Sequence, residues 1–282
     1  MMKRLGLYSL VFAVAATFAG CDPSIDTAYN EQVVVAGFIF ANEPVDSIVL
    51  HRTTPFGSYY DDLDYAVDSA RVAITVDGVE HVLLPTGLKG RYYLPASDLI
   101  VQGGKSYTLT VTAPNHQTGG EHHLSSTTQV PMPIHLDPWA DSIRGKTFVL
   151  DTTNAGAFVF LLTAGPAGGP DQRYLLSVTA LDTTYGRIHQ RSGEGIDSTQ
   201  VTRFANVQTG PAIAVTPRFL TWYGPNRITF YAIDTNWTDY QRQLLNAGMT
   251  GYQPSLNHVT GGMGVFASAA RDTVTIIVVP KR

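Results

Sequence analysis

Short runs of alternating apolar and polar residues dominate the chain after residue 32. The clearest run is 106–113, where Tyr107, Leu109 and Val111 alternate with threonines, so the apolar side chains face one side of a strand. Similar runs between glycine, proline or aspartate turns predict further strands at 33–40, 47–53, 71–76, 80–84 and 90–94. Short strands with a turn roughly every ten residues are typical of an immunoglobulin-like β-sandwich.

The second half of the chain has the same patterning and one helical segment. Strands are predicted at 157–162, 174–181, 200–204, 213–215, 227–233 and 273–279. The helical segment opens on the N-cap signal Thr238-Asp239 and ends before Gly248. Its apolar face is formed by Tyr240, Leu244 and Leu245. We therefore predict an all-β protein: an N-terminal immunoglobulin-like β-sandwich followed by a second β-sheet domain with one short helix.

A polar stretch rich in glycine and proline, residues 114–133, separates the two halves. It ends in Val130-Pro131-Met132-Pro133, which predicts a stiff extended connector, because proline fixes its own φ and restricts the residue before it. We place a domain boundary there, which gives domains at 32–130 and 131–282.

The N-terminal residues have the order of a secretory signal. Lys3 and Arg4 precede an apolar run at 5–18 that is shorter than the about 20 residues of a membrane-spanning helix. The tetrad 18–21 resembles a lipobox, with cleavage between Gly20 and Cys21 and lipid on the cysteine. Cys21 is the single cysteine, so it has no intramolecular disulfide partner, and acylation removes an odd thiol. We predict a signal peptide at 1–20 and a lipidated tether at 21–31.

Composition narrows the range of partners. The formal net charge of −4 gives no excess of positive charge for nucleic acid. Charged residues make up 15% of the chain, while threonine, valine, glycine and tyrosine are frequent, which suits strands and turns. We expect no nucleic-acid partner and no cofactor.

A dense acidic run is the first candidate for chemistry. It consists of Asp61, Asp62, Asp64 and Asp68, flanked by Tyr59, Tyr60 and Tyr65. Carboxylates at alternate positions can chelate calcium, but the glycine and closing glutamate of an EF-hand loop are absent. Tyrosine beside aspartate in a long loop also suits contact with a partner, and a solvated loop is the alternative. The candidate partner-binding residues are Tyr59, Tyr60, Asp61, Asp62 and Asp64.

Histidines and aromatic residues give two further clusters. The histidines are His116, His122, His123 and His135, and adjacent side chains on a strand diverge. We expect no metal site, although metal binding by these histidines or by the acidic run stays open. The aromatic residues are Trp222, Tyr223, Tyr231, Trp237, Tyr240 and Tyr252, for which core packing and stacking on a sugar or protein both stay open.

No catalytic signature accompanies these clusters. The segment 262–267 spells a dinucleotide fingerprint, but no βαβ unit surrounds it, so it predicts a glycine-rich bend before the last strands. There is no Gly-x-Ser-x-Gly elbow, and the only cysteine is assigned to lipid. We expect a protein that is not an enzyme.

The order of several weak motifs resembles one known family. They are the lipobox cysteine, Val-Val-Val-Ala-Gly at 33–37, Leu-His-Arg-Thr-Thr-Pro at 50–55, 68–74, Gly-Arg-Tyr-Tyr at 90–93, 104–111 and 261–266. This succession resembles the bacterial envelope lipoproteins catalogued as domain of unknown function 4249, over nearly the whole mature chain. The resemblance implies an envelope lipoprotein of Gram-negative bacteria, often encoded near TonB-dependent outer-membrane receptors, with no catalytic residue assigned.

The leading hypothesis is a non-enzymatic, membrane-anchored accessory or binding protein of the cell envelope, with such a receptor as candidate partner and the outer membrane favoured over the inner. A surface hydrolase of polysaccharide or peptide is one alternative, and it predicts a pocket with converging carboxylates or histidines. An adhesin or structural surface protein is another, and it predicts no concave site. The ligand and the oligomeric state stay open.

Overall fold

The computed structural model describes residues 29–55, 57–58, 61, 63–150, 160–165, 172–188, 200–210, 212–247 and 258–281. The predicted signal peptide, its cleavage site and Cys21 lie outside these residues, as do Tyr59, Tyr60 and Asp62. Glu31–Arg282 forms one compact unit. Within the described part, no helix has the length and apolar character needed to cross a membrane.

The first half of this unit is an immunoglobulin-like β-sandwich, as the sequence predicts. Its strands are β1 (Val33–Phe40), β2 (Val45–Arg52), β3 (Arg71–Val76), β4 (Val79–Val82), β5 (Leu84–Pro85), β6 (Arg91–Leu94), β7 (Ser106–Pro114) and β8 (Glu121–Gln129). One sheet has the order β16-β8-β7-β3-β4, where β16 is Val259–Thr260, and β1, β2, β6 and β5 belong to the other.

The core lies between these two sheets. Tyr107, Leu109 and Val111 of β7 are buried, as the alternation predicts, and they belong to one hydrophobic cluster with Ile48 and Leu50 of β2. Full burial of an aliphatic or aromatic side chain stabilises the fold by about 1.5–3 kcal/mol. This shared cluster therefore holds the two sheets together.

The second half adds more strands and the helices. Its elements are β9 (His135–Leu136), α2 (Pro138–Ile143), β10 (Thr147–Leu150), β11 (Phe160–Gly165), β12 (Arg173–Ala180), β13 (Thr202–Phe204), β14 (Ala212–Val215), η2 (Pro217–Phe219), β15 (Gly224–Ile233), α3 (Thr235–Ala247) and β17 (Met263–Pro280). β14, β11 and β9 form a small sheet. The all-β prediction with one short helix is confirmed in α3, and the six-residue α2 is an addition.

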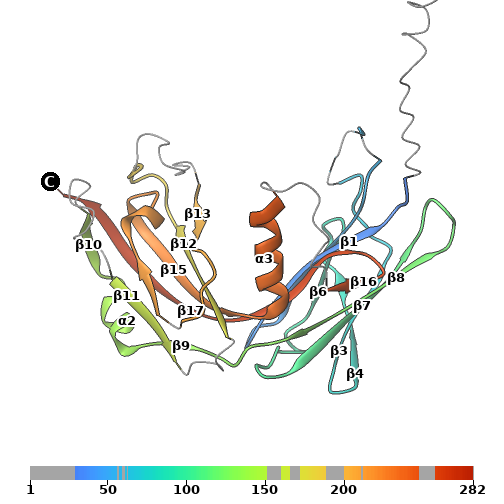
Figure 1. The fold of residues 1–282 in the computed structure, drawn as a ribbon, viewed down its shortest axis with the longest axis horizontal. Helices are drawn as coiled ribbons and strands as arrows, with labels where there is room; N and C mark the ends of the chain where they lie inside the picture. The colour runs from blue at the N-terminus through green and yellow to red at the C-terminus, as the bar shows by residue number, and fades with distance from the viewer. Residues whose placement is uncertain are drawn as a thin grey trace, which may run out of the picture. The chain divides into compact units, whose positions relative to one another are not determined.

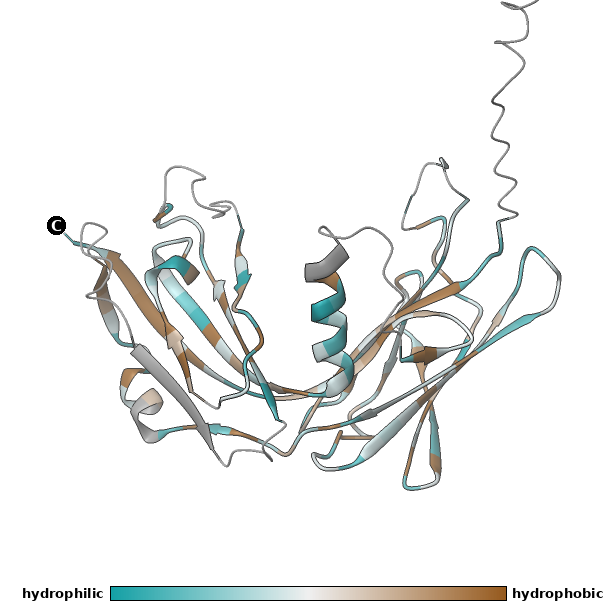
Figure 2. Cartoon of the chain, in the orientation of Figure 1, coloured by the Kyte–Doolittle hydropathy of each residue, from teal (hydrophilic) through white to brown (hydrophobic). Residues whose placement is uncertain are grey.

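β17 is the central strand of the nine-stranded sheet and has 18 residues. Its first part pairs in parallel with β1, from Met263 opposite Val34, and its later part pairs antiparallel with β15, up to Val278 opposite Gly224 (Figure 1). Apolar residues follow much of its length (Figure 2). The sheet thus continues from the N-terminal strands into the C-terminal ones, and the boundary at residue 130 stays a prediction.

β8 lies inside the polar stretch 114–133, for which the sequence pattern predicts no strand. Its inward-facing side chains are Leu124, Ser126 and Thr128, and all three are buried. Two of these three side chains are polar, so the strand lacks the apolar alternation by which strands are recognised. The sequence pattern therefore does not predict the strand at 121–129, although the predicted sandwich domain includes these residues.

α3 begins earlier than its sequence pattern indicates. Asp234, not Thr238, caps it: the Asp234 carboxylate accepts the Trp237 backbone N–H at 2.8 Å. The predicted apolar face is also wrong at Leu244, whose side chain is 53% exposed. Trp237, in the first turn of the helix, faces the sheet and is buried.

Candidate functional site

A pocket of about 590 Å³ lies where the end of β8 meets the beginnings of β12 and α3. Its described lining includes Ser106, Gln129, Gln172, Arg173, Asp234 and Asn236. This volume falls within the range of small-molecule sites, about 300–1,000 Å³. Arg173 and Asp234 are the two charged side chains of the described lining, which also contains the apolar residues Val130, Met132 and Ile233.

Asp234 joins three elements at the pocket. One carboxylate oxygen caps α3, and the other accepts a hydrogen bond from the Thr128 hydroxyl of β8. The Thr128 oxygen lies 2.6 Å from the hydroxyl of Ser268 on β17, which donates to it. Burial raises the pKa of Asp234, and the hydrogen bonds from Thr128 and from backbone N–H groups oppose that rise.

Asn236, which also lines the pocket, connects β8 of the five-stranded sheet with β17 of the nine-stranded sheet. Its side-chain amide donates to the backbone oxygen of Thr127 in β8 and to that of Phe266 in β17, both at 2.8 Å. Asn236 is itself buried. One amide thereby satisfies two strand carbonyls, a role that the sequence reading missed. The signal for it is the polar Asp-Thr-Asn run directly after an apolar strand.

The opposite wall is formed by the start of β12. The Gln172 side-chain amide donates to the backbone oxygens of Arg173 and Ile233, at 2.9 and 2.8 Å, which fixes this corner. The Arg173 side chain is partly buried, and no described acidic residue forms an ion pair with it. Among the described residues, the Arg173 guanidinium therefore has no ion-pair partner.

Replacement of Asp234 tests its protonation and its cap. Because the folded pKa lies above the unfolded value of about 3.9, the contribution of this group to stability is present at low pH. It is lost as pH rises through the raised pKa. Asp234→Asn keeps a capping oxygen but does not titrate. We therefore expect the unfolding free energy of the wild type to decrease above pH 4 relative to that of Asp234→Asn. Asp234→Ala should be less stable than Asp234→Asn by about 1 kcal/mol.

Urea unfolding of the wild type and both variants between pH 4 and 8 measures these effects. Parallel pH profiles of the wild type and Asp234→Asn would contradict the raised pKa.

Two of the four predicted histidines converge on Glu31, which is 7% exposed. The Glu31 carboxylate accepts the backbone N–H of His116 at 3.0 Å and lies 3.3 Å from His122 Nε2. Arg52 Nε lies 3.7 Å from the same oxygen, and Arg52 Nη2 donates to His116 Nε2 at 2.8 Å. A guanidinium only donates, so His116 Nε2 carries no proton here. We refer to Glu31, Arg52, His116 and His122 as the Glu31 cluster.

The remaining predicted ligands do not join this cluster. His123 points away from His122 and is exposed beside Glu121, and His135 is exposed in β9. Asp61 accepts the backbone N–H of Leu63 at 2.8 Å, a local turn contact. Within the described ranges, no three histidine, cysteine, aspartate or glutamate side chains are placed to hold a metal ion. The partner-binding role of residues 59–64 stays a prediction.

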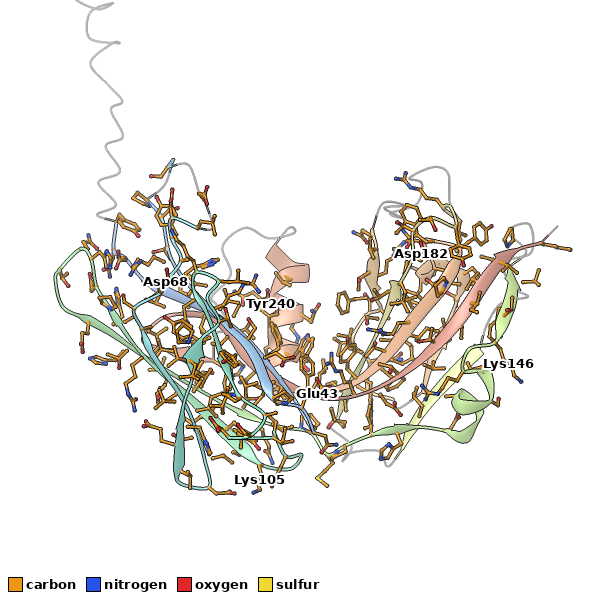
Figure 3. The ribbon with its side chains drawn as sticks, turned by 180° about the vertical axis from the view of Figure 1, so that it is seen from behind. Glu43, Asp68, Lys105, Lys146, Asp182 and Tyr240 are labelled. Carbon is orange, nitrogen blue, oxygen red and sulfur yellow. The ribbon has the colours of Figure 1, made fainter. Side chains whose placement is uncertain are left out.

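Several of the predicted aromatic residues pack between α3 and the large sheet. The ring centroids of Trp237 and Phe38 lie 4.7 Å apart, and those of Trp237 and Tyr231 lie 5.7 Å apart. The Tyr240 ring on α3 lies 6.1 Å from that of Phe38, and Arg271, which is ion-paired with Glu43, lies over the ring of Phe40; Figure 3 labels Tyr240 and Glu43. These contacts are core packing. Tyr252 lies outside the described residues.

Trp222 and Tyr223 lie elsewhere and are partly buried. The Arg187 guanidinium stacks on the Trp222 ring at 5.1 Å from its centroid. The five described aromatic residues of the predicted set therefore do not form one surface.

The family described as Domain of unknown function (DUF4249) matches residues 21–275. The chain belongs to the DUF4249 family. This confirms the resemblance that the order of motifs indicates. No curated protein matches the sequence of this DUF4249 chain.

Several solved structures match this DUF4249 protein at low identity and low TM-score. A two-domain fibronectin type-III segment of chicken tenascin has 9% identity and a TM-score of 0.20, with 73% of this chain and 91% of that chain covered. A SusE-like surface-located polysaccharide-binding protein from the heparin utilisation locus of Bacteroides thetaiotaomicron has 12% identity and a TM-score of 0.24, with 89% and 34% covered. Escherichia coli alpha-2-macroglobulin has 12% identity and a TM-score of 0.23, with 89% and 23% covered. This chain thus spans about a third of the SusE-like protein and about a quarter of the macroglobulin.

Proposed function

We propose that this DUF4249 protein is a non-enzymatic accessory or binding protein of the cell envelope, anchored through lipid on Cys21. The observation that carries the proposal is the pocket at the end of β8. In its described lining, the one carboxylate, Asp234, is occupied in capping α3, and no histidine is present. Such a lining offers hydrogen bonds and one cation to a ligand, which is suited to recognition by contact.

The same pocket bears on the two alternatives. A hydrolase needs an acid and a base placed to act on one bond, and two carboxylates or histidines do not converge in the described lining. An adhesin without a concave site does not account for a pocket of about 590 Å³. The lipobox residues support attachment to a membrane. The family resemblance supports a TonB-dependent outer-membrane receptor as partner.

Co-purification from native membranes tests this function. We expect the lipidated protein to recover an envelope partner, and Ser106→Trp, which fills the pocket with an indole, to lose that partner at least about tenfold. Ser125→Trp places the same side chain on an exposed position of β8 outside the pocket lining, so it should retain the partner. Recovery of no envelope protein, or equal recovery by the two variants, would contradict the proposal.

A further inference from the structure

One backbone position of β8 opens into the pocket. The Val130 N–H donates to the Lys105 oxygen at 2.9 Å, and Gln129 lies opposite Ser106 in the ladder with β7. Hydrogen-bonded and non-hydrogen-bonded pairs alternate along an antiparallel ladder. Gln129, the residue before Val130, therefore directs its backbone N–H and C=O away from β7, as do Thr127 and Ser125.

The other outward positions of this strand are occupied. Ser125 pairs with Thr260 of β16, and the Thr127 oxygen accepts the Asn236 amide. The N–H and C=O of Gln129 have no partner among the described residues, and Gln129 lines the pocket. The edge of β8 thus offers one donor and one acceptor, spaced as a strand offers them, to a chain lying in the pocket.

The charge of the pocket favours a carboxylate. Asp234 is compensated by the Thr128 hydroxyl and by the N-terminal end of α3, which carries about half a positive charge. Arg173 has no such compensation. A planar guanidinium binds a carboxylate through two parallel hydrogen bonds, an arrangement that a neutral amide does not reproduce.

We propose that the pocket binds the carboxyl-terminal end of an extended peptide segment, with its backbone paired to Gln129 and its carboxylate on Arg173. The inference rests on the proposed function and names its ligand class. An acidic sugar would supply the same carboxylate. However, none of the described lining residues is aromatic, so no ring offers a sugar a stacking face. The open strand edge is matched by a peptide backbone.

Titration of the mature chain with defined peptides, followed by amide NMR shifts, tests the inference. The probe is acetyl-Thr-Val-Thr-Val-Thr as the free acid, compared with the same peptide as its C-terminal amide. We expect the acid to bind about tenfold or more tighter than the amide, and Arg173→Gln to abolish that preference. Arg187→Gln, which removes a guanidinium outside the pocket, should leave it unchanged.

The backbone contact has its own pair of variants. Gln129→Pro removes the N–H that the peptide would use, and this N–H makes no bond to β7, so an edge strand tolerates the change. It should weaken binding of acid and amide alike, by about fivefold to tenfold, the worth of one hydrogen bond. Gln129→Ala keeps the N–H and should bind as the wild type does.

Several results would overturn the inference. These are equal binding of acid and amide, an acid preference that survives in Arg173→Gln, no binding of either peptide, or Arg173-dependent binding of glucuronic acid alone. If Arg173→Gln fails to fold, Arg173→Lys keeps the charge without the planar fork and should lose part of the acid preference; full retention counts against the inference. A pocket-dependent envelope partner in the Ser106→Trp comparison would still stand after any of these failures, so the two proposals fail separately.

Discussion

Gly264→Ala is expected to destabilise the protein by more than about 4 kcal/mol, enough to prevent accumulation of folded protein. Gly264 has a φ of +110°, and a Cβ atom there would lie 1.9 Å from the backbone oxygen of Val35. Val35 is the residue paired with Gly264 between β1 and β17. The methyl group would therefore force apart two central strands. No side-chain rotation relieves the clash, because the backbone fixes the positions of both the Cβ atom and the Val35 oxygen.

The matched control is Gly119→Ala. Gly119 also has a positive φ, of +74°, but a Cβ atom there meets nothing within 4 Å. It isolates the cost of the left-handed conformation, about 1–2 kcal/mol. Urea unfolding of the mature chain compares both variants with the wild type. Equal losses at the two glycines would show that β1 and β17 do not approach this closely.

Glu31→Ala is expected to cost about 3 kcal/mol, because it leaves the Arg52 guanidinium without its carboxylate in a site where that side chain is 11% exposed. It also leaves the His116 backbone N–H without an acceptor. Glu121→Ala is the matched control, since it removes a glutamate that is 61% exposed beside His123 and should change stability by less than about 0.5 kcal/mol.

A second substitution separates charge from packing in the Glu31 cluster. Adding Arg52→Met to Glu31→Ala removes the uncompensated charge, so the double variant should recover part of the lost stability. Chemical unfolding of the wild type, Glu31→Ala, Arg52→Met and the double variant at pH 7 gives the coupling free energy between the two residues. A double variant that is less stable than Glu31→Ala would show that Arg52 acts chiefly through its other contacts.

The strands that the sequence predicts well are those with an apolar face and a polar face. The runs at 33–40, 71–76 and 106–113 match β1, β3 and β7 closely. The sequence predicts β17 only at 273–279, because Gly262 and Gly264 indicate a bend there and Arg271-Asp272 interrupts the run of apolar and small residues. The predicted bend at 262–267 is wrong from Met263 onward, where the chain is the first part of β17 and pairs with β1. The sequence does not predict β8, because two of its three inward side chains, Ser126 and Thr128, carry hydroxyls, and the Thr128 hydroxyl bonds to Asp234 and Ser268.

The pocket was not predictable from spacing, because its parts come from distant segments. Thr128, Arg173 and Asp234 are brought together by the pairing of β12 with β15 and by the position of α3 beside β8. Histidine clustering in the sequence identified half of the Glu31 cluster. It did not identify Glu31, which is the first residue of the compact unit, or Arg52, which is the last residue of β2.

The central place of β17 also sets an order of folding. β1 is synthesised well before its parallel partner β17, so this ladder closes only after the long segment between them is available. Pairings between such distant segments form slowly and leave strand edges open to other chains in the meantime. Until β17 docks, β1 and β15 each lack a neighbour. The interval between synthesis of β1 and docking of β17 is therefore the period in which these strand edges are most open to pairing with other chains.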